Sequence, residues 1–166
     1  TNMDFESGSL APWMGTGSVT STPGEVYAGE YSGKLVGNQF LSQTVNLVAG
    51  TTYDFVWRFI ANDYLPFNDM SFVITSNGYN VLANVATVGD YGDTGWQYFS
   101  WVPTVNYSGP IFFGIADIGD TALSSVLLLD APVPLPGAAL LFGSALLGAG
   151  ALRRKQAAAK KVIALA

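Results

Sequence analysis

Four aspartates in the second half of the chain come nearest to a catalytic pattern: Asp90, Asp93, Asp117 and Asp120. Two carboxyl groups about 5 to 9 Å apart are the minimum for hydrolysis of a glycosidic bond. All four lie in glycine-rich turns, where aspartate is favoured because its side chain bonds the local backbone. We therefore expect them to shape loops, with a calcium site at Asp90 and Asp93 as an alternative.

Composition excludes most other catalytic chemistry. The chain has no Cys and no His, so it lacks a thiol nucleophile, an imidazole base and the commonest ligands of transition metals. We expect a protein that is not an enzyme and that needs no cofactor other than the structural calcium considered below.

Aromatic residues are the other side chains that could hold a ligand, because loop aromatics stack on sugar rings or anchor protein interfaces. Tyr27 and Tyr31 belong to this group, and an apolar loop tip runs from Tyr64 to Phe67. The alternative, that half or more of these rings complete the core, is equally open. The residues that we assign to ligand or partner binding are Trp13, Tyr64, Phe67, Tyr91 and Trp96.

The elements that must position these side chains have the pattern of antiparallel strands. Short alternating segments run from Gly33 to Asp130, separated by Gly, Asn, Asp, Ser and Pro. The clearest is 53–59, whose four aromatics at every second position share one buried face. We predict an all-β fold over residues 1–130, an antiparallel β-sandwich or jelly roll.

Individual strands can be predicted from the same alternation. We expect a hairpin that joins strand 40–47 to the strand beginning at Tyr53, and a second hairpin with Asn77 and Gly78 in a type I′ turn. Residues 89–95 and 103–110 are expected to be loops. The strands expected beyond the first hairpin are 70–75, 79–85, 96–102, 111–117 and 123–130.

The composition changes abruptly after Asp130. A Pro-rich linker, 131–136, precedes the uncharged segment 137–152, which ends at Arg153, Arg154 and Lys155. At about 1.5 Å per residue, roughly sixteen to twenty apolar residues span about 24 to 30 Å, the short end of a bilayer core. We predict one C-terminal transmembrane helix, 137–155, with a basic stop, followed by a cytoplasmic helical extension, 156–166, in contact with membrane lipid.

Small residues four apart in this segment would allow another helix to approach closely. Recognition of a glycine-rich signal by its protease is the competing explanation. The residues that we assign to helix packing are Ala139, Gly143, Ser144 and Gly148.

Charge is distributed very unevenly along the chain. All 12 acidic residues precede the uncharged segment, whereas all but two of the 7 basic residues, Lys34 and Arg58, follow it. The acidic body excludes a nucleic-acid partner. The positive-inside rule predicts a single-pass inner-membrane protein with a periplasmic N-terminal domain and a cytoplasmic C-terminus. Because the sequence begins at Thr1 without an apolar stretch, we expect that a signal peptide has been removed.

The segment 133–155 closely resembles the PEP-CTERM sorting signal, in a variant that reads Val-Pro-Leu-Pro at 133–136. A proline motif, a Gly-rich apolar helix and an Arg cluster follow one another in the required order. The resemblance implies a Gram-negative bacterium that makes exopolysaccharide, and processing by an exosortase. Two departures are Leu135, where the usual motif has Glu, and the continuation 156–166.

The body resembles the small jelly-roll domains attached to such tails, which are similar to carbohydrate-binding modules. The matching segments are Met3–Glu6 with Trp13, 31–35, 41–45 and 49–53. In the resembled modules a structural calcium ties the N-terminal acidic segment to the last strand, which implies Asp4, Glu6 and Asp130 as its ligands here. The alternative is that Asp130 caps a strand end and that Glu6 is solvated.

Two functions follow from these observations. The first is a non-catalytic, membrane-anchored extracytoplasmic β-sandwich with a structural or interaction role, as an accessory subunit that contacts other subunits of an inner-membrane protein complex. The alternative is a glycan-binding PEP-CTERM protein that an exosortase sorts to the exopolysaccharide layer, where its partner is a polysaccharide.

Overall fold

The structure is a computed structural model, and it describes residues 2–131. The chain divides into two units, Thr1–Val133 and Pro134–Ala166. The predicted transmembrane helix, its packing residues and its basic stop lie outside the described residues. Within the described part, no helix is long and apolar enough to cross a membrane.

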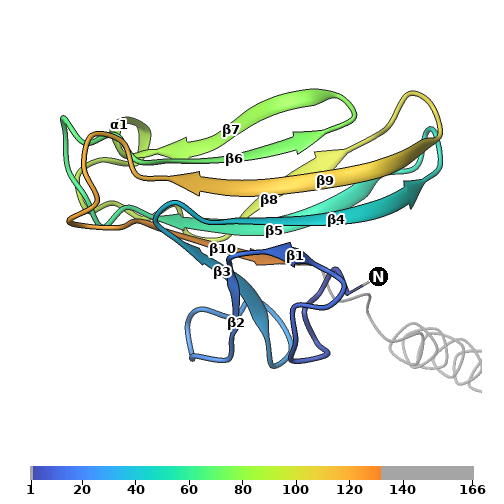
Figure 1. The fold of residues 1–166 in the computed structure, drawn as a ribbon, viewed down its shortest axis with the longest axis horizontal. Coiled ribbons are helices and arrows are strands. Elements are labelled where there is room, and N and C mark those ends of the chain that lie inside the picture. The colour runs from blue at the N-terminus through green and yellow to red at the C-terminus, as the bar shows by residue number, and fades with distance from the viewer. Residues whose placement is uncertain (1, 132–166) are drawn as a thin grey trace, which may run out of the picture. The chain divides into compact units, whose positions relative to one another are not determined.

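Two five-stranded antiparallel sheets form a β-sandwich, which confirms the predicted all-β fold. Figure 1 shows the two layers, with β6, β7 and β9 above and β10, β3 and β2 below. Sheet A runs in the order β1 (Met14–Gly15), β4 (Phe40–Leu47), β9 (Tyr107–Ala116), β6 (Met70–Thr75), β7 (Gly78–Asn84). Sheet B runs in the order β2 (Ser18–Thr20), β3 (Ser32–Val36), β10 (Val126–Asp130), β5 (Tyr53–Ile60), β8 (Gln97–Trp101). One short helix, α1 (Val85–Val88), follows β7.

The core lies between the two sheets. The predicted aromatic face of β5 is confirmed for Phe55, Trp57 and Phe59, which are buried, whereas Tyr53 is only half-buried at the edge of the core. Phe55 meets Phe113 of β9 edge to face, with ring centroids 5.0 Å apart, and this contact joins the two layers. Burial of such rings is the main stabilising contribution to the fold.

The predicted hairpin between strands 40–47 and 53–60 is wrong. β4 pairs with β1 and β9 in sheet A, whereas β5 pairs with β10 and β8 in sheet B. The connection after Leu47 therefore carries the chain from one sheet to the other. Both strands turn an apolar face toward the core. Two such strands can be neighbours in one sheet or can face each other from opposite sheets, so the apolar pattern does not decide between the two arrangements.

The β6–β7 hairpin is confirmed, but its turn is shifted by one residue. Gly78 pairs with Thr75 in the ladder, so that Ser76 and Asn77 form the turn. Gly78 has φ +109, a value that favours glycine. The strand predicted at 111–117 begins earlier, at Tyr107, because β9 tolerates Pro110 where only β4 pairs with it.

The outer face of sheet B is covered by the segment 21–31, which connects β2 to β3. Val56 and Leu128 point away from the core, yet both have no exposed surface. The carbonyl oxygen of Gly24 accepts a hydrogen bond from Arg58 Nη1 at 2.7 Å, and the amide of Tyr27 donates to Asp130 at 3.3 Å. These bonds hold the segment across the sheet.

Candidate functional site

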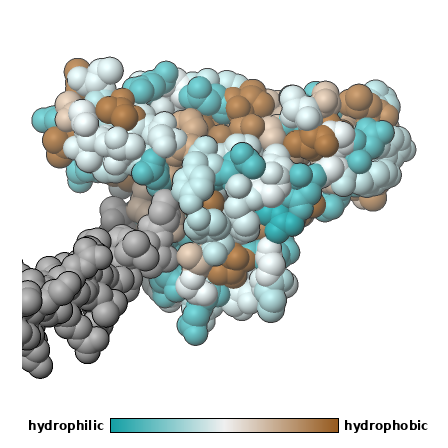
Figure 2. Space-filling view, turned by 180° about the vertical axis from the view of Figure 1, so that it is seen from behind, coloured by the Kyte–Doolittle hydropathy of each residue, from teal (hydrophilic) through white to brown (hydrophobic). Residues whose placement is uncertain are grey.

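Among residues 2–131, nothing covers the outer face of sheet A, in contrast to that of sheet B. Along β4 the odd positions from Leu41 to Leu47 are buried, and the even positions from Phe40 to Asn46 point outward. Figure 2 shows brown apolar groups at the surface among hydrophilic ones. The apolar residues exposed on this face include Met14, Ile74 and Val81.

Four aromatic rings cross this face, one from each of four neighbouring strands. Phe40 stacks on Phe112 at 5.1 Å between ring centroids, and Phe112 stacks on Phe72 at 6.0 Å. Phe72 then meets Tyr79 at 5.2 Å. Phe40 is 38% exposed and Tyr79 53% exposed, so both ends of the row reach solvent. We call Phe40, Phe112, Phe72 and Tyr79 the aromatic row.

Gly114 makes this arrangement possible. It pairs with Phe40 on one side and with Phe72 on the other. A Cβ at this position would lie 2.4 Å from the tip of the Phe72 ring, which is too close for any real contact. The missing side chain therefore leaves the space into which Phe72 leans.

Neutral polar groups follow the row along β4 and β9. Ser42 and Thr44 point outward from β4. Further along, the hydroxyl of Ser108 lies 2.7 Å from Asn46 Oδ1. These two residues also line a hollow of about 240 Å³, together with Asn106 and Tyr107. Hydroxyl and amide groups beside apolar rings are the combination that a sugar, with its C–H faces and hydroxyls, requires.

The predicted binding residues Tyr64, Phe67 and Tyr91 are brought together at one end of the sandwich. Tyr64 lies 5.5 Å from Phe67 and 5.8 Å from Tyr91, measured between ring centroids. Their loops are tied by the amide of Tyr91, which donates to the carbonyl oxygen of Asp63 at 2.9 Å. Tyr91 is 61% exposed and has φ +54, which is unusual for a residue with a side chain.

The other two predicted binding residues lie elsewhere. Trp13 is buried in the core, stacked on Phe5 at 5.5 Å, and its indole N–H donates to the carbonyl oxygen of Asn2 at 2.6 Å. Trp13 is therefore a core residue, which agrees with the alternative prediction that some of these aromatics complete the core. Trp96 meets the ring of Tyr27 at 5.5 Å, beside the segment that covers sheet B.

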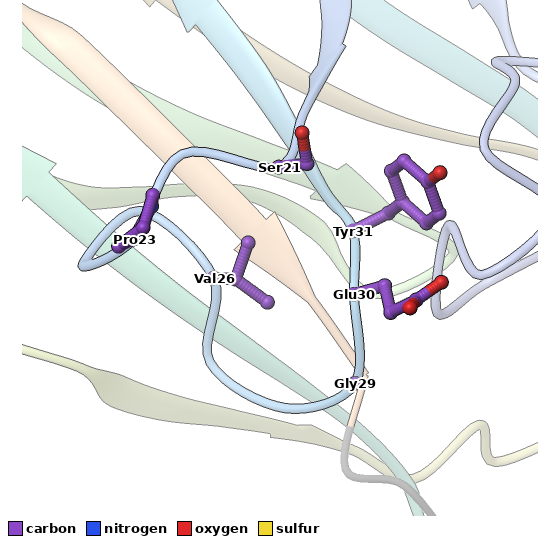
Figure 3. A pocket seen from close by; sticks show the side chains of 6 residues that line it. All are labelled: Ser21, Pro23, Val26, Gly29, Glu30 and Tyr31. Atoms are coloured by element: carbon purple, nitrogen blue, oxygen red, sulfur yellow. The ribbon is translucent and has the colours of Figure 1, made fainter.

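A second hollow, of about 390 Å³, lies within the segment 21–31. Figure 3 shows Val26 and Pro23 on one side of it, and the side chains of Tyr31 and Glu30 directed away from them. The hollow offers one aromatic ring, whereas sheet A offers four. It is the weaker candidate for stacking on a ligand.

The carboxylates predicted to hold calcium bind the second half of the same segment. Asp130 Oδ2 accepts hydrogen bonds from the amides of Tyr27 and Ala28, both at 3.3 Å. Glu6 Oε1 accepts from the amides of Glu30 at 3.1 Å and Tyr31 at 3.0 Å. These bonds engage both carboxylates.

Asp4 does not complete a metal site with them. Its Oδ1 accepts a bond of 3.4 Å from the amide of Glu6. Among residues 2–131, no three acidic side chains converge in a way that could hold a metal. Calcium binding by Asp4, Glu6 and Asp130 stays a prediction, and the arrangement of the three carboxylates does not support it.

The four loop aspartates each bond nearby loop or strand groups. Asp93 is paired with Arg58, Asp90 accepts from the amide of Leu65, and Asp120 accepts from the amide of Ala122. Asp117 accepts from the hydroxyl of Ser124 at 3.0 Å, and burial raises the pKa of its carboxyl group. These contacts agree with the expectation that the aspartates shape loops.

Comparison with known proteins gives the fold. No family model and no curated protein matches the chain. The module CBM27-1 of Caldicellulosiruptor saccharolyticus, solved in complex with mannohexaose, matches 78% of this chain and 93% of its own, with a TM-score of 0.52 and 14% identity. The likeness shows a shared jelly-roll β-sandwich.

Two further structures are similar at lower TM-scores. TmCBM61, solved in complex with beta-1,4-galactotriose, matches 79% of this chain and 92% of its own, with a TM-score of 0.48 and 21% identity. A family 16 carbohydrate-binding module matches 78% of this chain and 94% of its own, with a TM-score of 0.46 and 20% identity.

The aromatic row is the feature that sequence reasoning missed. The signal was present in Phe40, Phe72 and Phe112, which alternate with residues that the structure buries. A strand that is apolar on both faces predicts that its outer face is also covered, by protein or by a ligand.

Proposed function

We propose that the domain is a non-catalytic glycan-binding module and that the outer face of sheet A is its binding site. The aromatic row carries this proposal, because four neighbouring rings form an apolar strip across the sheet, against which the C–H faces of several sugar units can pack. The hydroxyl and amide groups of Ser42, Thr44 and Asn46 lie on the same face and can bond sugar hydroxyls.

The shared fold with a mannohexaose-binding module is consistent with this function but does not identify the ligand. We further propose that the module acts outside the cytoplasm. The segment 133–155, which resembles a sorting signal, would deliver it there or anchor it at the inner membrane. The anchored-subunit role rests on that segment, which lies outside the described residues. The glycan-binding role rests on the row.

Titration calorimetry of the full chain in mild detergent tests the proposal. The ligands are mannohexaose and hexamers of β-1,4-linked galactose, xylose and glucose. In the variant Tyr79→Ala we expect about tenfold weaker binding, because loss of an aromatic contact costs on the order of 1 kcal/mol. In the double variant Phe40→Ala/Tyr79→Ala we expect a further loss of similar size.

Tyr98→Ala is the matched control, since Tyr98 is a tyrosine of similar exposure, 60%, on sheet B. It should bind as the wild type does. Tyr91→Ala tests the loop cluster in the same way. Loss of binding in Tyr91→Ala with no loss in Tyr79→Ala would move the site to the loops, and absence of binding by every hexamer would overturn the function.

A further inference from the structure

Sheet A has no charged residue in any of its strands, although the domain as a whole is strongly acidic. None of the strands β1, β4, β6, β7 and β9 contains Asp, Glu, Lys or Arg. Sheet B differs, since its strands carry Lys34, Asp54, Arg58 and Asp130. Charge is therefore absent from the sheet that exposes the aromatic row.

The groups beside the row are neutral in both directions along the strands. The polar ones are hydroxyls and amides, from Ser42 and Thr44 to the pair of Asn46 and Ser108. The apolar ones include Met14, which pairs with Ser42, and Ile74, which pairs with Phe112. A ligand lying along the described strands of this face therefore meets no charged side chain from them.

Both basic residues of the domain are held in ion pairs on sheet B. Lys34 Nζ lies 2.5 Å from Glu25 Oε1. The Nε–H of Arg58 is shared between the two carboxylate oxygens of Asp93, at 2.9 and 3.2 Å, and Nη2 donates to Oδ2 of the same carboxylate. Neither cation is on a strand of sheet A. Within residues 2–131, an anionic ligand there would find no cationic partner and would be repelled by the acidic excess of the domain.

We propose that the face of sheet A selects uncharged glycans and excludes polyanionic ones such as polyuronates. This inference rests on the proposed glycan-binding function and names its substrate class. Stacking and neutral hydrogen bonds supply the affinity, so binding should depend little on salt. An acidic glycan would lose its hydration at the face without gaining an ion pair in return.

Matched ligand pairs test this selection. A β-1,4-linked mannose hexamer and a β-1,4-linked mannuronate hexamer share linkage and ring stereochemistry, and differ in the carboxylate of each unit. The glucose and glucuronate hexamers, and the galactose and galacturonate hexamers, form further pairs. Each is titrated into the full chain at ionic strengths of about 0.01 and 1 M, where charges are screened over roughly 30 and 3 Å.

We expect the neutral member of a binding pair to bind at least tenfold more tightly than its uronate. Its affinity should change less than about twofold between the two salt concentrations. Equal or tighter binding of a uronate by the wild type would overturn the selection while the glycan-binding function stands. Absence of binding by all members of all pairs would overturn both.

A charge-gain variant tests the stated cause. Thr44 is exposed on the face and pairs with Pro110, so Thr44→Lys places a cation where the wild type has none. Thr44→Met, of similar length but uncharged, is its control. We expect Thr44→Lys, but not Thr44→Met, to bind the uronate at least tenfold more tightly than the wild type at low salt. An unchanged uronate affinity in Thr44→Lys would show that the missing cation is not the cause, and would overturn the inference.

Discussion

The carboxylate of Asp130 accepts a hydrogen bond from the hydroxyl of Ser32 at 2.8 Å, and neither residue has any exposed surface. Asp130 ends the last strand, and Ser32 begins β3. Burial raises the pKa of Asp130, against the lowering effect of the bonds from Ser32 and from the amides of Ala131, Ala28 and Tyr27. The free energy of unfolding should therefore depend on pH through this group.

The sign of that dependence follows from the raised pKa. The folded state keeps the proton of Asp130 to higher pH than the unfolded state, whose pKa is about 3.9. The contribution of Asp130 to stability is complete below that pH and is lost as the pH rises through the folded pKa. Urea unfolding measures this dependence. We expect the unfolding free energy of the wild type minus that of Asp130→Asn to decrease as the pH rises. A difference that grows with pH would contradict this account.

Replacing Gly114 should disturb the aromatic row directly. In Gly114→Ala the new Cβ must displace the Phe72 ring, which we expect to cost about 1 to 3 kcal/mol of stability and to weaken glycan binding. In a Phe72→Ala background the same change should cost clearly less, because the obstructing ring is absent. Urea unfolding of the four proteins in this cycle gives the coupling. Equal costs in both backgrounds would show that Phe72 is not what Gly114 accommodates.

Tyr91 provides a test of backbone strain in the loop cluster. Tyr91→Gly and Tyr91→Ala both remove the ring, but only glycine adopts φ +54 without a steric penalty. We expect Tyr91→Gly to be about 1 kcal/mol more stable than Tyr91→Ala. The comparison needs only thermal or urea unfolding, and an alanine variant as stable as the glycine variant would argue against the strained conformation.

Calcium can be tested without knowledge of the ligand. An ion held by Glu6 and Asp130 would bind the folded state alone, so calcium added after EDTA should raise the Tm of the wild type. Glu6→Gln should show no such rise. An unchanged wild-type Tm after EDTA and then excess calcium would end the prediction.

Alternation predicted the strands well because it is a local property of the chain. In the run from Tyr53 to Phe59, the alternation shows which residues share a face, and the aromatic face is the one that packs into the core. The hairpin between β4 and β5 failed because pairing partners are chosen across the whole domain, where a strand's inward face fits either sheet. Sequence spacing holds no information on that choice.

The binding face shows a second limit of the same kind. In β6 the smaller residues Ser71, Val73 and Thr75 face the core, while Phe72 and Ile74 face outward. Residue size alone would favour the opposite orientation. The side that is buried is set by the partner sheet, and Gly114, whose role is to leave space, carries no signal of its own in a single sequence.

The position of β10 determines when the domain can be completed. Of the strands in residues 2–131 it is the last, yet it lies between β3 and β5 in the middle of sheet B, and its Asp130 bonds the segment 21–31. Until β10 has been synthesised, β3 and β5 have no strand between them, and the segment 21–31 lacks its hydrogen bonds to Asp130. A ribosome must therefore release nearly the whole domain before the two sheets can close on each other.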